Sequence, residues 1–251
     1  MSRAFVTLLY GDTGCGKTYV AMTFPEPILF IDTENRAENK RLVHFKDKKI
    51  KIEEPMELKT EVNKSMDDIF DEVGSINNLT NSLSQYIKAI NEGKIKGGTL
   101  VIDNVTDLWS WTQSWMFDKL SKLTTKSGQQ RANNDLMTVT SQLDWKVANN
   151  KHDGIVRVLR SLIKNEIYIV FTAKQKSLPD YAMSNPSNKE KVRAQKEIPF
   201  MSDVIFNLIR QNGEYIAVCE KLGEQPLPQT TIRNLNFDKI ISLNPLGEIN
   251  E

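Results

Sequence analysis

The sequence predicts an α/β protein whose mainly parallel, twisted sheet is flanked by helices. Three observations indicate this class. Short apolar runs alternate with longer helix-like stretches along the 251 residues, which is typical of strands joined by right-handed helical crossovers. The first apolar run leads directly into a glycine-rich loop and a helix-like segment. Near the C-terminus, an Asn-Gly pair separates two further apolar runs, which predicts that an antiparallel hairpin completes the sheet.

The expected strands of the parallel part are almost wholly apolar, as buried strands with helices on both faces should be. They are Ala4–Tyr10, Pro27–Asp32, Thr99–Asp103 and Glu166–Thr172, with a weaker candidate at Lys48–Glu53. The expected helices are Tyr19–Phe24, Leu79–Glu92, Thr106–Leu123 and Met137–Lys164. The expected hairpin strands, on either side of QNGE, are Asp203–Arg210 and Tyr215–Glu220.

Composition and length bound the organisation of the chain. We expect one core over residues 1–221 and an extended C-terminal tail packed on it over residues 222–251. The polar stretch Lys176–Lys196 is expected to form a long mobile loop. A net charge of +1 excludes a uniformly cationic nucleic-acid-binding protein, so any such affinity needs a local patch. No apolar run reaches about 18 residues, so no membrane contact is expected, and two cysteines fit a reducing cytoplasm.

Residues 11–18, GDTGCGKT, match the pattern G-x-x-x-x-G-K-[ST] of a phosphate-binding loop. Glycines let backbone N–H groups surround a phosphate without interference from a Cβ atom. We expect Lys17 to reach the β- and γ-phosphates of ATP, and the Thr18 hydroxyl to bind Mg²⁺. The residues expected to contact the nucleotide are Gly11, Asp12, Thr13, Gly14, Cys15, Gly16, Lys17, Thr18 and Tyr19.

Two carboxylates at expected strand ends complete a candidate site for ATP hydrolysis. Asp103 ends the apolar run GTLVID, where it could hold Mg²⁺ together with Thr18, or instead cap the following helix. Many ATPases carry a catalytic glutamate directly after this aspartate, but here that residue is Asn104. We therefore expect Glu34, at the end of FIDTE, to orient and deprotonate the attacking water, although a solvated surface glutamate also fits this position.

These motifs together resemble the RecA-type recombinase core. That family carries its catalytic glutamate in a context that Ile31–Glu34 matches, so the resemblance implies a RecA-like P-loop NTPase fold and supports Glu34. It also implies that a residue after the apolar run IYIVFT senses the γ-phosphate. Lys174 is the expected sensor and Gln175 the alternative. The recombinases have glutamine there, so Lys174 is a departure that puts the coupling between ATP and DNA in question.

A more specific resemblance, over most of residues 3–240, is to the minimal RecA-like ATPases of phages and archaeal viruses. It implies a DNA-stimulated ATPase that acts on single-stranded DNA in recombination or annealing, in the host cytoplasm if the source is viral. It also implies a homo-oligomeric ring or filament and a single-strand-binding or annealing protein as partner. DNA would contact two loops, through Lys126, Arg131, Lys176, Lys189, Lys191, Arg193 and Lys196. Arg193 or Lys196 could instead reach the ATP of a neighbouring subunit.

Two other classes of protein share the expected nucleotide residues. A helicase-like or DNA-packaging motor would translocate along DNA, and the absence of an accessory domain in this short chain counts mildly against it. A nucleotide-gated regulatory protein would use the cationic loop to bind an acidic protein rather than DNA. Stimulation of the ATPase by single-stranded DNA distinguishes the regulator from the DNA-dependent enzyme.

Overall fold

A computed structural model describes residues 3–59, 69–122, 142–176, 191–228 and 231–247. For residues 142–144 and 191 it describes the backbone but not the side chains. Among these residues a nine-stranded sheet has the order β11-β10-β9-β1-β7-β6-β2-β3, and β8 pairs with β7. Its parallel strands are β1 (Val6–Gly11), β2 (Ile28–Asp32), β3 (Ile50–Glu53), β6 (Gly98–Asp103), β7 (Ile167–Lys176) and β9 (Val204–Gln211). The antiparallel additions are β8 (Lys191–Arg193), β10 (Glu214–Leu222) and β11 (Ile232–Arg233). The predicted fold class is confirmed.

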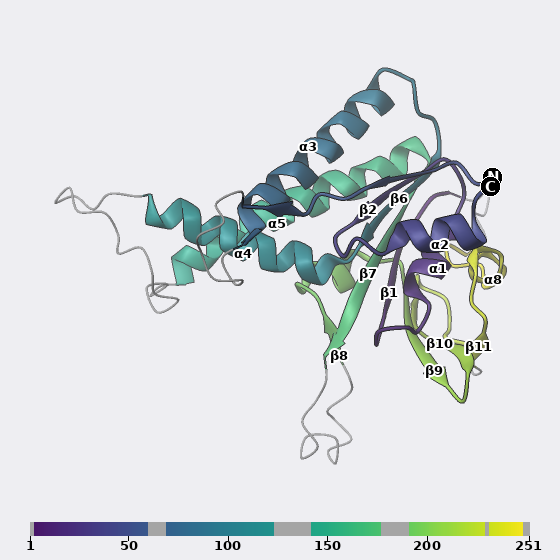
Figure 1. The fold of residues 1–251 in the computed structure, drawn as a ribbon. Coiled ribbons are helices and arrows are strands. Elements are labelled where there is room, and N and C mark those ends of the chain that lie inside the picture. The colour runs from purple at the N-terminus through teal and green to yellow at the C-terminus, as the bar shows by residue number, and fades with distance from the viewer. Residues whose placement is uncertain (1–2, 60–68, 123–141, 177–190, 229–230, 248–251) are drawn as a thin grey trace, which may run out of the picture.

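Helices cover both faces of this sheet (Figure 1). One face carries α3 (Glu72–Asn91), α4 (Val105–Ser121), α5 (Gln142–Ser161) and α7 (Glu197–Met201). The other carries α1 (Lys17–Met22), α2 (Ala37–His44) and α8 (Phe237–Ser242). A short 3₁₀ helix, Leu162–Asn165, follows α5, and a separate two-stranded sheet joins β4 (Glu57–Leu58) to β5 (Phe70–Asp71).

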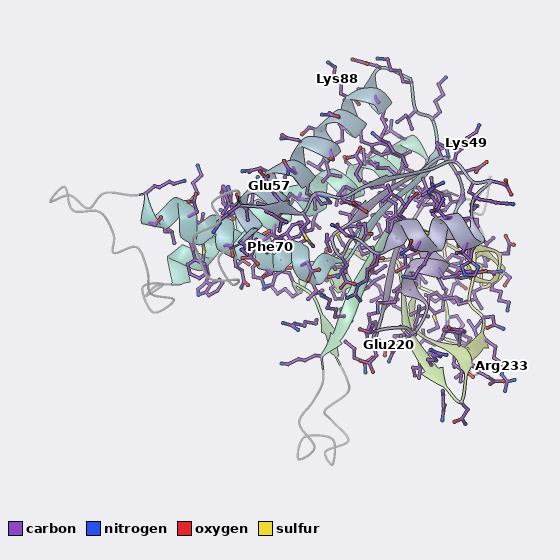
Figure 2. The ribbon with its side chains drawn as sticks, viewed as in Figure 1. Lys49, Glu57, Phe70, Lys88, Glu220 and Arg233 are labelled. Carbon is purple, nitrogen blue, oxygen red and sulfur yellow. The ribbon has the colours of Figure 1, made fainter. Side chains whose placement is uncertain are left out.

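Strand β1 shows why the central strands are apolar throughout. Val6, Leu8 and Tyr10 join the hydrophobic core under α3, α4 and α5, whereas Phe5 and Leu9 join the core under α1 and α8. Successive side chains of a strand point to opposite faces of the sheet, so both sets are buried. Charged side chains such as Lys49, Lys88 and Arg233 lie at the periphery of the molecule (Figure 2).

The register of the parallel strands aligns their carboxyl ends. Asp32 pairs with Asp103, and Asp103 pairs with Thr172. On the other side of β7, Gly11 of the phosphate loop pairs with Lys174. In open α/β sheets ligands bind at this edge of the strands. Residues that lie far apart in the sequence therefore meet at one edge of the sheet.

Two helices differ from the sequence prediction. Helix α3 begins at Glu72 rather than Leu79, because Asp71 caps it by accepting a hydrogen bond of 2.9 Å from the backbone N–H of Gly74. Helix α2 was not among the helices expected from the sequence. Asp32 stabilises its first turn by accepting hydrogen bonds of 2.6 Å from the N–H groups of Arg36 and Ala37.

Two segments also differ from the expected loop and tail. The described part of the Lys176–Lys196 stretch ends β7 and forms β8, while residues 177–190 lie outside the described residues. Beyond Leu222 the chain adds β11 and α8, so this region has regular structure that an extended tail would lack. Among the described residues, none of the helices combines the length and the apolar character needed to cross a bilayer.

The β9–β10 hairpin has the turn that its Asn-Gly pair predicts. Asn212 and Gly213 both have positive φ, at 52° and 83°. A two-residue turn of this kind matches the right-handed twist of the flanking strands. The turn brings Tyr215 opposite Arg210 in the ladder, at the edge where the parallel strands end.

The two glycines Gly213 and Gly154 provide a matched test of this account. Neither would bring a new Cβ atom within 4 Å of a neighbour, but only Gly213 has positive φ. Gly213→Ala should lower the free energy of unfolding by about 1–2 kcal/mol, because an L-residue is strained there. Gly154→Ala, inside α5, should raise it by about 0.5–1 kcal/mol. Urea denaturation measures both; equal effects of the same sign would contradict the assigned turn.

Candidate active site

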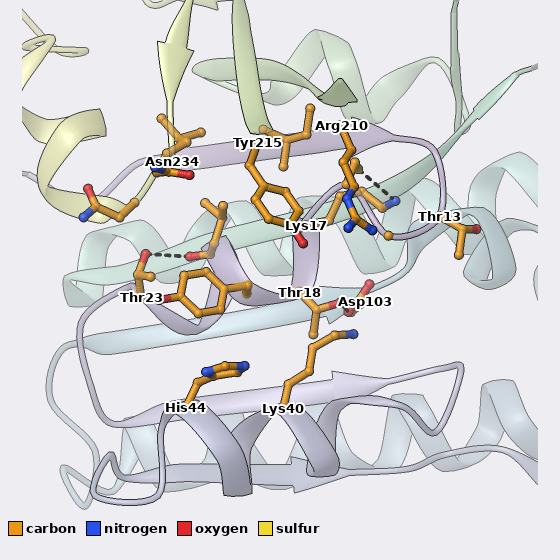
Figure 3. A pocket seen from close by; sticks show the side chains of 18 of the residues that line it. Thr13, Lys17, Thr18, Thr23, Lys40, His44, Asp103, Arg210, Tyr215 and Asn234 are labelled. Carbon is orange, nitrogen blue, oxygen red and sulfur yellow. Dashed lines mark hydrogen bonds between the residues drawn. The ribbon is translucent and has the colours of Figure 1, made fainter. Parts of the chain in front are cut away.

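A cavity of about 760 Å³ opens at the carboxyl ends of the parallel strands. The phosphate loop forms one wall, and the ends of β2, β6 and β7 form another. Helix α2, the β9–β10 hairpin and the segment around Asn234 line the remainder (Figure 3). All four residues expected to be catalytic line this one cavity: Lys17, Glu34, Asp103 and Lys174.

The phosphate loop depends on glycine at its first position. Gly11 has φ +148°, and a Cβ atom there would lie 2.1 Å from the backbone oxygen of Leu208 on β9. Gly14 and Gly16 also have positive φ, at 80° and 97°. The Nζ atom of Lys17 donates hydrogen bonds of 2.8 Å to the backbone oxygens of Gly11 and Asp12. A glycine-lined loop with a cation held against it fits a polyphosphate chain.

Thr18 and Asp103 meet where a divalent cation would bind. The Thr18 hydroxyl donates a 2.7 Å hydrogen bond to Asp103 Oδ2, and the Thr172 hydroxyl donates to Asp103 Oδ1. Hydroxyl and carboxylate oxygens are ligands that Mg²⁺ prefers, with phosphate oxygens and water completing its shell. No group of three or more His, Cys, Asp or Glu side chains suited to a metal occurs among the described residues. The residues present thus fit a Mg²⁺ ion bound jointly with a nucleotide.

Asp103 does not cap the following helix, so that alternative from the sequence is wrong. The N-cap of α4 is Asn104, whose side-chain oxygen accepts a 2.9 Å hydrogen bond from the N–H of Asp107. Burial raises the pKa of Asp103, against the hydrogen bonds from Thr172 and Thr18. A bound cation would favour the ionised carboxylate at this position.

Glu34 faces the cavity through a network of polar side chains. Its Oε1 atom lies 2.9 Å from Lys174 Nζ and accepts a 2.9 Å hydrogen bond from the Asn104 side-chain amide. Lys174 Nζ also lies 3.0 Å from Asp107 Oδ1, so one ammonium group bridges two carboxylates. The Thr33 hydroxyl donates to the other oxygen of Asp107 at 3.0 Å. Glu34 is therefore held at the edge of the cavity instead of pointing into solvent.

The ion pair keeps Glu34 ionised. Burial alone would raise the pKa of Glu34, but the hydrogen bond and charge of Lys174 outweigh it and lower that pKa below its usual value. Burial likewise lowers the pKa of Lys174, and the hydrogen bonds to Glu34 and Asp107 more than compensate. An ionised carboxylate can accept a proton, but the lowered pKa makes Glu34 a weaker base while Lys174 is paired with it.

A second cavity, of about 700 Å³, shares Lys174 with the first. Its other lining residues come from the first turns of α4 and from β7, β8 and the residue after β8: Thr106, Asp107, Trp109, Ser110, Gln113, Gln175, Lys176, Val192, Arg193 and Ala194. Thr106 connects the two strands of this wall, because its hydroxyl donates to the backbone oxygen of Arg193 and accepts from the N–H of Lys174. Lys174 thus lines the nucleotide cavity, whereas Gln175 lines only the second one.

The basic residues expected to contact DNA are partly described. Lys176, Arg193 and Lys196 are exposed, and Lys176 and Arg193 line the second cavity. Lys191 begins β8 opposite Lys176 in the ladder. Lys126, Arg131 and Lys189 lie outside the described residues.

Sequence reasoning missed several residues that line or support the nucleotide cavity. Asp107 lies three positions after the cap residue Asn104, a spacing typical of the start of a helix. This spacing could have identified Asp107 from the sequence. Arg210 and Tyr215 flank the predicted turn and so face one another in the ladder. Nothing in the local sequence indicates that Lys40, His44, Asn234 and Lys239 also line this cavity.

Comparison with known proteins shows which family the chain matches. A protein family described as an AAA domain matches residues 3–238. Among solved structures, a KaiC-like protein, PH0186, from the hyperthermophilic archaeon Pyrococcus horikoshii OT3 is similar at 16% identity and a TM-score of 0.45. The alignment covers 91% of this chain and 84% of that one. No curated protein matches the sequence.

The position of Glu34 generates a direct test of its role. Glu34→Gln keeps the shape of the side chain but removes its basicity, so ATP turnover should fall at least ~100-fold while ATP affinity changes little. Steady-state hydrolysis and equilibrium titration with ATP measure the two quantities. Glu92→Gln, at the exposed end of α3, is the matched control and should leave both unchanged. Unaltered turnover in Glu34→Gln would remove Glu34 from the reaction.

Proposed function

The chain belongs to the AAA domain family, and from this premise we propose that it couples ATP hydrolysis to the binding of single-stranded DNA in recombination or annealing. That it is a P-loop ATPase of RecA-like type follows from the family and from the phosphate loop. The DNA substrate is our inference. It is carried by one observation: Lys174 lines both the nucleotide cavity and the second cavity beside it.

The chemistry at the nucleotide end divides among the cavity residues. The phosphate loop and Lys17 bind the triphosphate, and Thr18 with Asp103 holds the metal, which would neutralise charge on the phosphates. Glu34 orients and deprotonates water, and the Lys174 ammonium lies beside it to sense the terminal phosphate. In-line hydrolysis needs positioning and charge stabilisation of this kind rather than covalent chemistry.

Exposed cations on the paired strands β7 and β8 support a polyanionic ligand at the second cavity. Lys176 and Arg193 are both exposed, and both line that cavity. Phosphates of a nucleic-acid backbone would pair with these two cations. Trp109, at the same cavity, supplies an aromatic ring on which an unpaired base could stack.

Lys174 gives a route for coupling between the two cavities. Its ammonium group contacts Glu34 on the nucleotide side and Asp107, which lines the second cavity. A phosphate bound in the second cavity would compete with Glu34 and Asp107 for this cation. DNA binding would then change the surroundings of Glu34, which is a differential contact of the kind that coupling requires.

The remaining parts of the proposal rest on the resemblance to viral and phage ATPases. They are assembly into a homo-oligomeric ring or filament, cooperation with a single-strand-binding or annealing protein, and action in the cytoplasm of the host. A helicase-like or packaging motor would share the same residues but would move along DNA. A regulatory protein would bind an acidic protein partner at the basic residues of β7 and β8.

Hydrolysis measured with and without single-stranded DNA tests the coupling. We expect saturating oligonucleotide to raise ATP turnover, because it draws Lys174 away from Glu34. The same measurement on Lys174→Met should show no such rise. Wild-type turnover that ignores DNA would contradict the DNA-dependent enzyme and favour the regulatory protein.

The salt dependence of DNA binding tests the location of the contact. Replacing both Lys176 and Arg193 with Gln should reduce the slope of log Kd against log salt by about 1.4, since each phosphate contact of a single strand contributes about 0.7. Lys88→Gln, on α3 with a side chain that is 77% exposed, is the matched control and should keep the wild-type slope. If the double variant also keeps the wild-type slope, Lys176 and Arg193 do not contact phosphate.

A further inference from the structure

Asp107 lies in the first turn of α4 and contacts both side chains that hold Glu34. The ammonium group of Lys174 lies 2.9 Å from Glu34 Oε1 and donates a 3.0 Å hydrogen bond to Asp107 Oδ1. The side-chain amide of Asn104 donates to the same oxygen of Glu34 at 2.9 Å and to Asp107 Oδ2 at 3.0 Å. An ammonium group has three N–H bonds and an amide has two, so each can serve both carboxylates at once. Both of these donors to Glu34 are therefore shared with Asp107.

The two carboxylates differ in how firmly their surroundings hold them. Asp107 Oδ2 also accepts a 3.0 Å hydrogen bond from the hydroxyl of Thr33, which is buried. The backbone N–H of Asp107 donates a 2.9 Å hydrogen bond to Asn104 Oδ1, so the carboxylate projects from a capped helix turn. Glu34 instead lies in the loop between β2 and α2, and its Oε2 atom is 3.8 Å from the guanidinium group of Arg36, beyond hydrogen-bond distance. Asp107 is therefore the fixed carboxylate of the pair, and Glu34 is the less restrained one.

The contacts of Glu34 oppose its role as a base. Burial raises the pKa of Glu34, but the Lys174 ammonium lowers it below its usual value, so the carboxylate accepts a proton more readily after it has turned away from Lys174. Turning away costs free energy if it leaves donors without an acceptor. Asn104 is buried, and the Lys174 side chain is only 40% exposed. Asp107 lowers this cost, because both donors keep a hydrogen bond when Glu34 leaves them.

We propose that Asp107 is a positioning residue for ATP hydrolysis. It keeps Lys174 and Asn104 in place while the carboxylate of Glu34 turns to the attacking water. Asp107 lines the second cavity but not the nucleotide cavity, so it acts through these two donors and not by contact with ATP. The proposal rests on Glu34 as the base, which is part of the proposed function.

Asp107→Asn keeps the size of the side chain and removes its negative charge. Lys174 would then pair with Glu34 alone, which makes Glu34 harder to release. We expect kcat for ATP hydrolysis to fall about tenfold, within the roughly 100-fold that a displaced supporting group costs. The Kd for ATP should change by less than about twofold, since the loss concerns the reaction and not binding. Steady-state hydrolysis and equilibrium titration with ATP measure the two quantities, and unchanged ATP affinity also shows that the variant is folded.

Asp107→Glu is the conservative variant. It keeps the negative charge and both acceptor oxygens, so it should recover most of the turnover that Asp107→Asn loses. Loss of ATP affinity along with turnover in both variants would show that Asp107 only supports the fold, and this result would overturn the proposal.

A double-mutant cycle with Lys174→Met tests whether Asp107 acts through Lys174. Replacing two residues that act through one another gives non-additive effects. In the Lys174→Met protein, Asp107→Asn should therefore lower kcat by about threefold or less, compared with about tenfold in the wild type. Equal losses in the two backgrounds would overturn the proposal.

Asp118→Asn is the matched control. Asp118 lies on the same helix and also pairs with a lysine, Lys122 at 2.7 Å, but it lines neither of the two cavities. Its replacement should leave both kcat and Kd unchanged. Wild-type turnover in Asp107→Asn, with turnover still lost in Glu34→Gln, would overturn the role of Asp107 alone. Unaltered turnover in Glu34→Gln would overturn the proposed function as well.

Discussion

The in-register alignment of β1, β7, β6 and β2 is the constraint on which the site depends. Asp103 lies between Asp32 on one neighbouring strand and Thr172 on the other, while Gly11 pairs with Lys174. A shift of one residue in any of these strands would move its side chains to the opposite face of the sheet. Close packing of the buried cores on both faces opposes such a shift, because each side chain would have to leave the space that it fills. Packing of the core therefore sets the geometry of the chemistry.

Charge compensation is the second organising feature. Burial, with the charges of Asp32 and Glu34 nearby, raises the pKa of Asp103 and makes its ionised form costly. Lys174 offsets two of the carboxylates by bridging Glu34 and Asp107. No described lysine or arginine bridges Asp103 in this way. Asp103 instead lies beside Thr18, where the two side chains could bind a metal ion together. The proposed link between DNA binding and ATP hydrolysis follows because Lys174 lines both cavities.

Local patterns predicted the parts of the site that form within one strand–loop unit. The phosphate loop, Asp103 and Glu34 each follow an apolar run, and parallel strand ends meet at one edge, so their convergence was foreseeable. Asp107 and Tyr215 were missed because their importance comes from partners distant in the sequence, Lys174 and the Gly16 backbone. Helix α2 was missed because its first turn is stabilised by Asp32 rather than by a cap within the helix. The roles expected for Lys126, Arg131 and Lys189 concern residues outside the described part of the chain.

The central claim is that Glu34 faces the terminal phosphate of a nucleotide whose metal lies at Thr18 and Asp103. A crystal structure with Mg²⁺, ADP and aluminium fluoride, which together mimic the transferring phosphoryl group, measures this most directly. We expect a Glu34 carboxylate oxygen within about 3 Å of the water in line with aluminium, the distance that proton abstraction requires. A structure in which another group holds that water, with Glu34 still bound to Lys174 and Asn104, would contradict it.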